Sequence, residues 1–179
     1  FKAGSLVVAN YKKFMKGKRE FEVLFEPTDS TSLAGYTATN NHILLTTMRD
    51  VRNEIEVLTP TKDGWTRASL PGLPAFGTLS VSAVEREKSD DYWLSVSDYV
   101  TPSTLGMGTI GGGPADVLKQ LPSQFDATGI EVGQHFATSK DGTKIPYFMV
   151  SKKDLIRDGT TPTLLYGYGG FEISMQPRY

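Results

Sequence analysis

The chain has 179 residues, of which 39% are hydrophobic and 22% charged, a composition typical of a globular protein and not of a disordered one. Nineteen Lys and Arg residues balance twenty Asp and Glu residues, and the net charge of -1 excludes a general electrostatic attraction to nucleic acid or to an anionic membrane. The absence of cysteine excludes disulfides and thiolate metal sites. We therefore expect a soluble protein, cytoplasmic or periplasmic, with neither nucleic acid nor membrane as partner.

The first half of the sequence reads as short β-strands. The sequence begins FKAGSLVVAN, without an initiator Met or an apolar leader, so we expect these residues to belong to a longer protein. Segments rich in β-branched, apolar and aromatic residues follow one another, separated by turns of Gly, Pro, Asp, Ser and Lys. The expected strands are residues 6–11, 21–26, 42–48, 53–60, 79–85 and 92–100.

Two of these strand-rich units resemble each other. The units that begin at Asn40 and Asp90 both contain an apolar strand, a polar interruption and a second strand, with an offset of about 50 residues. This period is typical of β-propeller blades. We therefore interpret residues 1–107 as a few propeller blades, which by themselves cannot close a ring and leave sheet edges without partners.

Residues 108–125 differ from what precedes them. A glycine cluster leads to Pro114, and Val117, Leu118 and Leu121 then fall on one side of a predicted short helix. We interpret this segment as a linker with one short helix.

Residues 106–111, GMGTIG, match the nucleotide-binding fingerprint G-x-G-x-x-G. That fingerprint requires a strand that turns directly into a long helix, whose N-terminus binds the pyrophosphate. Here Gly112 and Gly113 delay the helix and a hairpin follows, so we reject a dinucleotide site and expect no cofactor.

A second pattern occupies residues 126–179. Asp141-Gly142 lies between two strand-like segments and predicts a tight hairpin turn, because this pair accommodates positive φ angles. Residues 163–169, TLLYGYG, form a continuous apolar run of the kind found in strands that are buried on both faces.

Few residues in the chain have the spacing of catalytic or metal-binding groups. His42 and His135 lie 93 positions apart, so we interpret both as ordinary strand histidines and expect no metal site. No G-x-S-x-G sequence occurs, and no Ser is placed on a strand-to-helix turn between glycines, so the chain offers no credible nucleophile of its own.

The remaining candidate is the glycine-rich loop 166–171, YGYGGF. A tyrosine between glycines can direct its hydroxyl outward and donate to a developing oxyanion, and a nearby phenylalanine can line an apolar pocket. Tyr168 and Phe171 are the residues in question. The alternative is a tight turn whose aromatic residues only pack.

The sequence YGYGGFEIS of residues 166–174, together with SKDGTKIPYFMV at 139–150 and TPTLL at 161–165, closely resembles the prolyl oligopeptidase family of serine peptidases. The resemblance is strong over residues 126–179 and weaker before them, where SVSDYVTPSTL at 95–105 resembles the end of that family's propeller.

This resemblance implies a seven-bladed propeller that covers an α/β-hydrolase domain and admits short peptides, which are cleaved after proline. Residues 126–179 would be the first strands of the hydrolase domain, Tyr168 an oxyanion donor and Phe171 part of the substrate-binding pocket for proline. The chain would be a fragment without the Ser, Asp and His of the triad, and inactive alone. Its partners would be the remainder of the same protein or further copies of itself.

Two other hypotheses remain open. The chain could be a non-catalytic binding module that pairs with another protein through its sheet edges. It could also be a fragment of a related serine hydrolase of different specificity.

Overall fold

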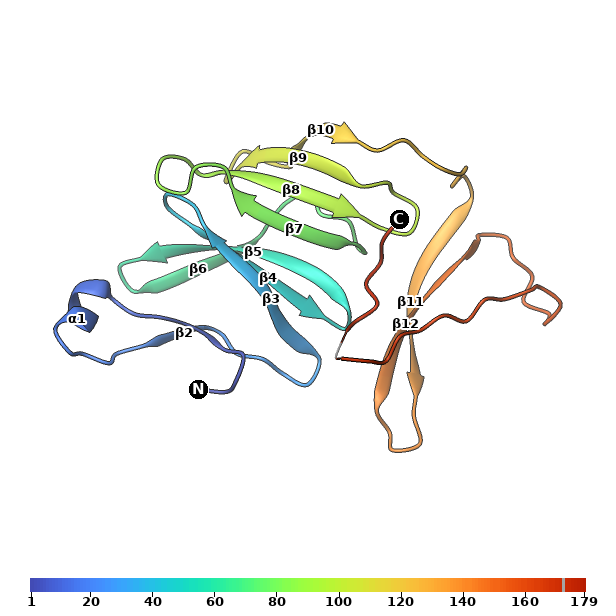
Figure 1. The fold of residues 1–179 in the computed structure, drawn as a ribbon, viewed down its shortest axis with the longest axis horizontal. Coiled ribbons are helices and arrows are strands. Elements are labelled where there is room, and N and C mark those ends of the chain that lie inside the picture. Colours follow the sequence, from blue (N-terminus) through green and yellow to red (C-terminus); the bar gives the residue numbers. More distant parts are fainter. Residues whose placement is uncertain (172) are drawn as a thin grey trace.

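The computed structural model describes residues 1–171 and 173–179, and almost all regular structure in them is β-strand. Two four-stranded antiparallel sheets lie beside each other, and a long hairpin extends away from them (Figure 1). A two-stranded pair near the N-terminus completes the sheets. The predicted mainly β architecture with blade-like sheets is confirmed.

The first four-stranded sheet is a meander in which each strand pairs with the next along the chain. Its turns are tight: Asp50 and Val51 adopt positive φ angles of 47° and 66°, and Gly64 has a φ of 132°. The apolar run of the second strand places Leu44 and Leu45 in the interior, where neither is exposed. The strands in spatial order are β3 (Thr31–Ala38), β4 (Ile43–Arg49), β5 (Arg52–Thr61) and β6 (Gly64–Ser69).

The second sheet repeats this arrangement. Its strands in chain order are β7 (Thr78–Ala83), β8 (Asp91–Ser97), β9 (Thr104–Thr109) and β10 (Asp116–Gln120). Strand β7 lies against β3, β4 and β5 of the first sheet. The main core fills the space between the sheets and includes Leu44, Ile55, Leu79, Tyr92 and Leu94. Burial of these side chains holds the two sheets together.

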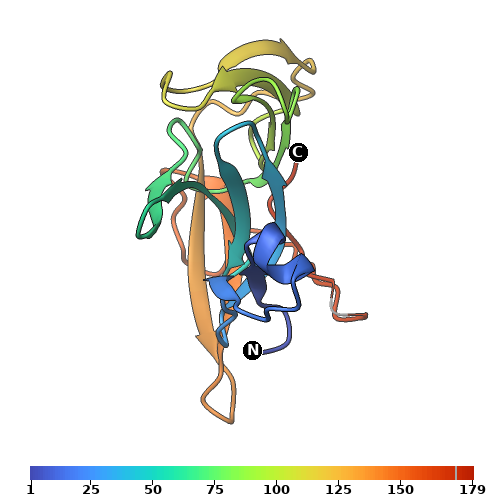
Figure 2. The ribbon, with the colours of Figure 1, turned by 90° about the vertical axis from the view of Figure 1, so that its left-hand side faces the viewer.

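The N-terminal residues cover the other side of the first sheet. Strands β1 (Leu6–Val8) and β2 (Glu22–Phe25) pair, and Leu24 packs with Leu45 and Leu58 in a second core cluster. Between them lies a five-residue helix, α1 (Tyr11–Met15), visible in Figure 2 near the N-terminus. Our predicted strand 6–11 therefore ends early, because the Asn10 side chain caps a helix by accepting a hydrogen bond from the backbone N–H of Lys13 at 3.1 Å.

The short helix expected after Pro114 is wrong. Residues 116–120 form β10, which pairs antiparallel with β9, and Val117 and Leu118 are exposed. The backbone of β9 offers hydrogen bonds along its free edge, whereas the apolar side chains expected on one face of the helix stay exposed among the described residues, so the strand is favoured. The expected boundary at residue 107 consequently falls inside β9, and the second sheet continues to Gln120.

The glycines of residues 106–111 serve the sheet. Gly106 and Gly108 lie within β9, which is a strand and not a turn into a helix. A Cβ at Gly108 would lie 2.5 Å from the hydroxyl oxygen of the fully buried Tyr92. Glycine is therefore needed here for close packing.

The third unit is a long hairpin. Strands β11 (Ile130–Thr138) and β12 (Lys144–Lys152) pair in register from Ile130↔Lys152 to Thr138↔Lys144. The predicted turn at Asp141-Gly142 is confirmed, with a φ of 89° at Gly142. Each strand of this hairpin has only the other as a partner among the described residues.

The strand expected at residues 163–169 is wrong in this structure. The segment forms no ladder, and Leu164 and Leu165 are 89% and 95% exposed. An extended segment becomes a strand only when neighbouring strands accept its backbone hydrogen bonds, and none lies beside it in the described chain. The start of an α/β-hydrolase domain therefore stays a prediction.

Candidate functional site

The loop 166–171 is exposed at the surface of the structure. Tyr168 is 48% exposed and Phe171 is 91% exposed, so both aromatic side chains face solvent. Phe171 adopts a positive φ of 55°, a conformation that is unusual for a bulky residue and that marks local strain. Among the residues that the structure describes, no nucleophile lies beside Tyr168 and Phe171.

The glycines of the loop allow its backbone to turn under the Tyr168 ring. A Cβ at Gly170 would lie 3.2 Å from the Tyr168 hydroxyl oxygen, so the ring lies close over this glycine. The Gly170 carbonyl accepts a hydrogen bond from the backbone N–H of Ile173 at 3.1 Å, which closes a turn. The Tyr168 side chain thus lies half-exposed over a turned loop, and its hydroxyl can donate one hydrogen bond.

The residues after this loop, 173–179, return to the second sheet. We call them the C-terminal strap. Pro177 is fully buried, and its carbonyl oxygen accepts hydrogen bonds from both the backbone N–H and the hydroxyl of Thr78, at the start of β7. Strap residues and Thr78 also line a small cavity of about 210 Å³.

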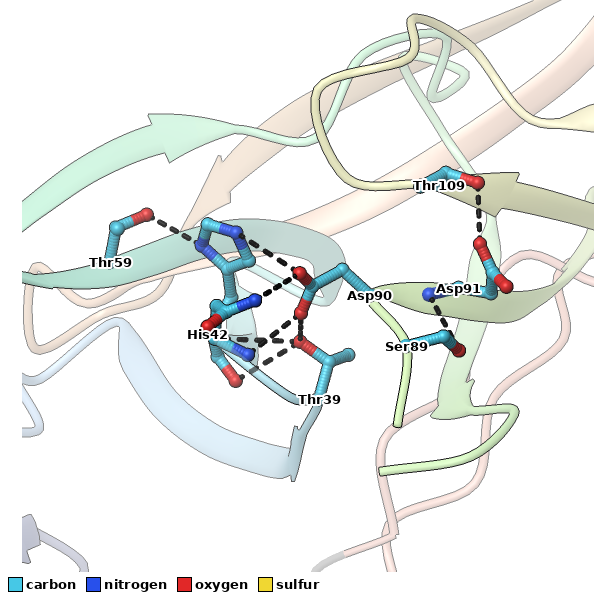
Figure 3. A network of polar contacts seen from close by, with 8 residues as sticks. Thr39, His42, Thr59, Ser89, Asp90, Asp91 and Thr109 are labelled. Carbon is cyan, nitrogen blue, oxygen red and sulfur yellow. Dashed lines mark hydrogen bonds and ion pairs between the residues drawn. The ribbon is translucent and has the colours of Figure 1, made fainter. Parts of the chain in front are cut away.

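A polar network joins the two four-stranded sheets (Figure 3). The Asp90 carboxylate accepts hydrogen bonds from the Thr39 hydroxyl at 2.8 Å, from the backbone N–H of Asn41 at 2.8 Å and from the Asn41 side chain at 2.7 Å. His42 Nε2 lies 3.9 Å from the same carboxylate, and its Nδ1 lies 2.7 Å from the Thr59 hydroxyl. His42 is therefore held by the network, in agreement with a structural role.

The electrostatics of this network favour a charged Asp90. Burial alone would raise the pKa of Asp90, but hydrogen bonds from Asn41 and Thr39 and the nearby His42 outweigh it and hold the pKa below its ordinary value. The ionised carboxylate accepts three hydrogen bonds, all from residues at the end of the first sheet, and so stabilises the junction between the sheets. We therefore assign this network a structural role.

The second histidine also has an ordinary environment. His135 lies in β11 and its ring is 5.5 Å from the ring of Tyr147 on the paired strand. In the part of the chain that the structure describes, no three His, Asp or Glu side chains gather closely enough to hold a metal ion. Nor does any described helix have the length and apolar character needed to cross a membrane.

Comparison with known proteins identifies relatives along the whole chain, although no family model matches it. An uncharacterized peptidase, y4nA, of Sinorhizobium fredii is 39% identical over 181 residues, which cover all of this chain and 25% of the relative. The prolyl endopeptidase of Elizabethkingia miricola is 34% identical over 154 residues, covering 86% of this chain and 20% of the enzyme. A solved structure of a post-proline cleaving enzyme from Rickettsia typhi superposes with a TM-score of 0.77 at 27% identity, covering 99% of this chain and 26% of that one.

The chain belongs to the prolyl oligopeptidase family. It spans about a quarter of the length of the relatives that it matches. The resemblance read from the residues 166–174 and their lead-in segments is thereby confirmed at the level of the family.

Sequence reasoning missed two features of this prolyl oligopeptidase family chain. The sequence indicated Asp90 only as the first residue of a strand-rich unit, and it did not single out Thr78. The partners of Asp90 are 49 to 51 positions away, and Pro177 is 99 positions from Thr78. No local sequence pattern carries such contacts; only the offset between the strand-rich units, which begin at Asn40 and Asp90, pointed to a relation between the two regions.

Proposed function

We propose that this chain is part of a serine endopeptidase that cleaves short peptides on the carboxyl side of proline. The observation that carries the proposal is similarity along the whole chain to a protein described as a post-proline cleaving enzyme, with a TM-score of 0.77. The prolyl endopeptidase from Elizabethkingia miricola supports the same specificity at 34% identity.

In this proposal the chain contributes parts of two domains. The two four-stranded sheets are propeller blades, and the hairpin β11–β12 with residues 153–171 and 173–179 begins the α/β-hydrolase domain. The exposure of Leu164 and Leu165 supports this division, since two apolar side chains on an extended segment match a sheet strand whose neighbours belong to other parts of the protein.

The chemical role that we assign to this chain is stabilisation of the oxyanion. When a serine alkoxide attacks the peptide carbonyl, the oxygen gains negative charge and binds hydrogen-bond donors more tightly than the ground state does. The Tyr168 hydroxyl would be such a donor, and its neighbours Gly167 and Gly169, where an added Cβ would meet no atom within 4 Å, leave open space for a substrate. Phe171 would contact the proline ring.

The attacking serine and its Asp and His partners would come from residues outside this chain. The 179-residue chain alone is therefore expected to be inactive. The test is to compare the purified chain with the longer protein that contains it, using a chromogenic peptide with proline before the cleaved bond and its alanine analogue. We expect the longer protein to cleave the proline peptide faster than the alanine analogue. The chain alone should cleave neither peptide. Turnover by the chain, or a longer protein that ignores proline, would contradict the proposal.

A binding role through sheet edges is the second candidate, because both strands of the hairpin β11–β12 have a free edge in the described chain. Exposed apolar side chains on this hairpin, Phe136, Ile145, Tyr147 and Val150, would then be covered by a partner. Under the main proposal that partner is the rest of the same protein. Light scattering of the purified chain, with and without the remainder of the protein, distinguishes the two. If the chain still associates with other copies when the remainder is present, an independent binding module is favoured.

A further inference from the structure

The C-terminal strap is held against the second sheet at two points. At the first, the Pro177 carbonyl accepts from the Thr78 backbone N–H at 3.1 Å and from the Thr78 hydroxyl at 2.7 Å. Pro177 itself is fully buried and Thr78 is half-buried, so these hydrogen bonds are partly shielded from water. A carbonyl that receives two donors from one residue has a closely defined position.

The second point is Tyr179. Its backbone N–H donates to the Ser97 hydroxyl at 3.1 Å, at the end of β8. Its phenol oxygen accepts from the backbone N–H of Gln124 at 2.7 Å, and its ring stacks on Phe125 with centroids 5.2 Å apart and an interplanar angle of 9°. The strap is therefore fixed on both sides of Arg178.

A short covalent path connects this anchor to Tyr168. Ile173 is hydrogen-bonded to Gly170, over which the Tyr168 ring lies. Three residues separate Ile173 from Pro177, and such a stretch spans at most about 14 Å. The position of Pro177 therefore restricts where the turn beneath Tyr168 can lie.

We propose that Thr78 is a positioning residue that, through the Pro177 carbonyl, fixes the loop bearing Tyr168 relative to strand β7. The proposal rests on the proposed function in assigning Tyr168 to the oxyanion. The second four-stranded sheet then sets the position of the loop that carries Tyr168. A change in the packing of β7 should therefore lower kcat and leave KM nearly unchanged.

The first experiment tests the anchor itself by hydrogen exchange in the intact protein. Thr78→Val removes the hydroxyl and keeps the shape, Thr78→Ser keeps the hydroxyl, and Thr66→Val removes an exposed strand hydroxyl on β6 as the control. Loss of one hydrogen bond should speed exchange in peptides covering 173–179 by roughly three- to tenfold in Thr78→Val. Thr78→Ser and Thr66→Val should exchange like the original protein. Unchanged exchange in Thr78→Val would overturn the anchor.

The second experiment tests positioning by kinetics with a proline peptide. Thr78→Val should lower kcat roughly three- to tenfold with little change in KM, Thr78→Ser should restore it, and Thr78→Val should add nothing to a Tyr168→Phe variant. Additive losses in the double variant would overturn the positioning role. Should Thr78→Val fold poorly, Ser97→Ala, which loosens the other end of the strap, is expected to shift exchange and kcat in the same direction.

These outcomes separate the two proposals. If Tyr168→Phe leaves kcat unchanged, the proposed function of Tyr168 fails, whatever the exchange data show. If Tyr168→Phe slows turnover but Thr78→Val does not, only the positioning role fails.

Discussion

The Asp90 carboxylate accepts a hydrogen bond from the Thr39 hydroxyl, with 2.8 Å between the oxygens, across the junction between the two four-stranded sheets. The same carboxylate binds Asn41 through its backbone and its side chain, and the backbone N–H of Asn40 donates to the Ser89 carbonyl at 3.0 Å beside it. The turn that precedes β4 is thus fastened to the turn that precedes β8. The two sheets are held by apolar packing along their faces and by this charged group at one end.

Replacing Asp90 by Ala should destabilise the chain by about 2–3 kcal/mol, because the Thr39 hydroxyl and the Asn41 amides lose a charged acceptor. Asp91→Ala is the matched control, since the Asp91 carboxylate accepts from the Thr109 hydroxyl at 2.5 Å within a single sheet. Urea unfolding measures both. A loss for Asp90→Ala no larger than that for Asp91→Ala would contradict the assigned role of the junction.

The junction should also make stability depend on pH at the acidic end. The pKa of Asp90 is lowered from the ordinary value of 3.8 in the folded chain. The unfolded state therefore binds the proton more readily, so the contribution of Asp90 is fully present above pH 3.8 and is lost as the pH falls through its folded-state pKa. In Asp90→Asn the free energy of unfolding should fall less steeply below about pH 4 than in the original protein. Parallel curves would show that other carboxylates account for the acid sensitivity.

The packing of Tyr92 against β9 makes Gly108 sensitive to substitution. A Cβ at this position would lie 2.5 Å from the Tyr92 hydroxyl oxygen and 2.6 Å from the ring carbon that bears it. Since Tyr92 is fully buried and cannot move away freely, Gly108→Ala should cost about 1–3 kcal/mol in unfolding free energy. Gly35→Ala in β3 is the control, because a Cβ there meets nothing within 4 Å. Equal stability of the two variants would refute this account.

The sequence correctly predicted those strands that have an alternating apolar pattern and turn residues of their own. Alternating apolar residues with turn residues between them place β4, β5 and β8, and Asp141-Gly142 places the hairpin turn. The segment after Pro114 was misjudged because a short amphipathic pattern fits a helix locally, whereas the free edge of β9 decides in favour of a strand. The helix propensity of a short segment takes no account of a backbone partner on another strand, and here the paired residues lie 9 to 16 positions earlier in the chain.

The residues around the candidate site also differ in whether the local sequence indicates them. Tyr168 and Phe171 were singled out because glycines lie next to them in sequence, and the roles that a family resemblance implies for them stay predictions. Thr78 was not found, because its partner Pro177 is 99 positions away and a threonine at the start of a strand is unremarkable by itself. Contacts across such distances require the folded arrangement of the sheets.

Removing the Tyr168 hydroxyl tests the oxyanion role in the intact protein. Tyr168→Phe should lower kcat by roughly one hundred- to one thousandfold and leave KM nearly unchanged, because the hydrogen bond strengthens only as charge develops on the carbonyl oxygen. Tyr166→Phe is the matched control, since Tyr166 lies two positions earlier in the same exposed loop. A similar kcat for both variants would exclude Tyr168 from the oxyanion site.

Truncating Phe171 tests whether this residue recognises the proline of the substrate. The ring is 91% exposed in this structure, so its removal should cost the fold little, and Phe171→Ala should change the unfolding free energy by less than about 0.5 kcal/mol. Loss of an apolar contact with the proline ring should lower kcat/KM for a proline peptide. The lost transition-state stabilisation should be about 1–3 kcal/mol. The loss should be much smaller for the alanine analogue, whose side chain does not reach the ring. Equal losses for the two peptides would place Phe171 outside the specificity pocket, and Phe171→Leu, which keeps apolar bulk, should retain part of the preference if the contact is the cause.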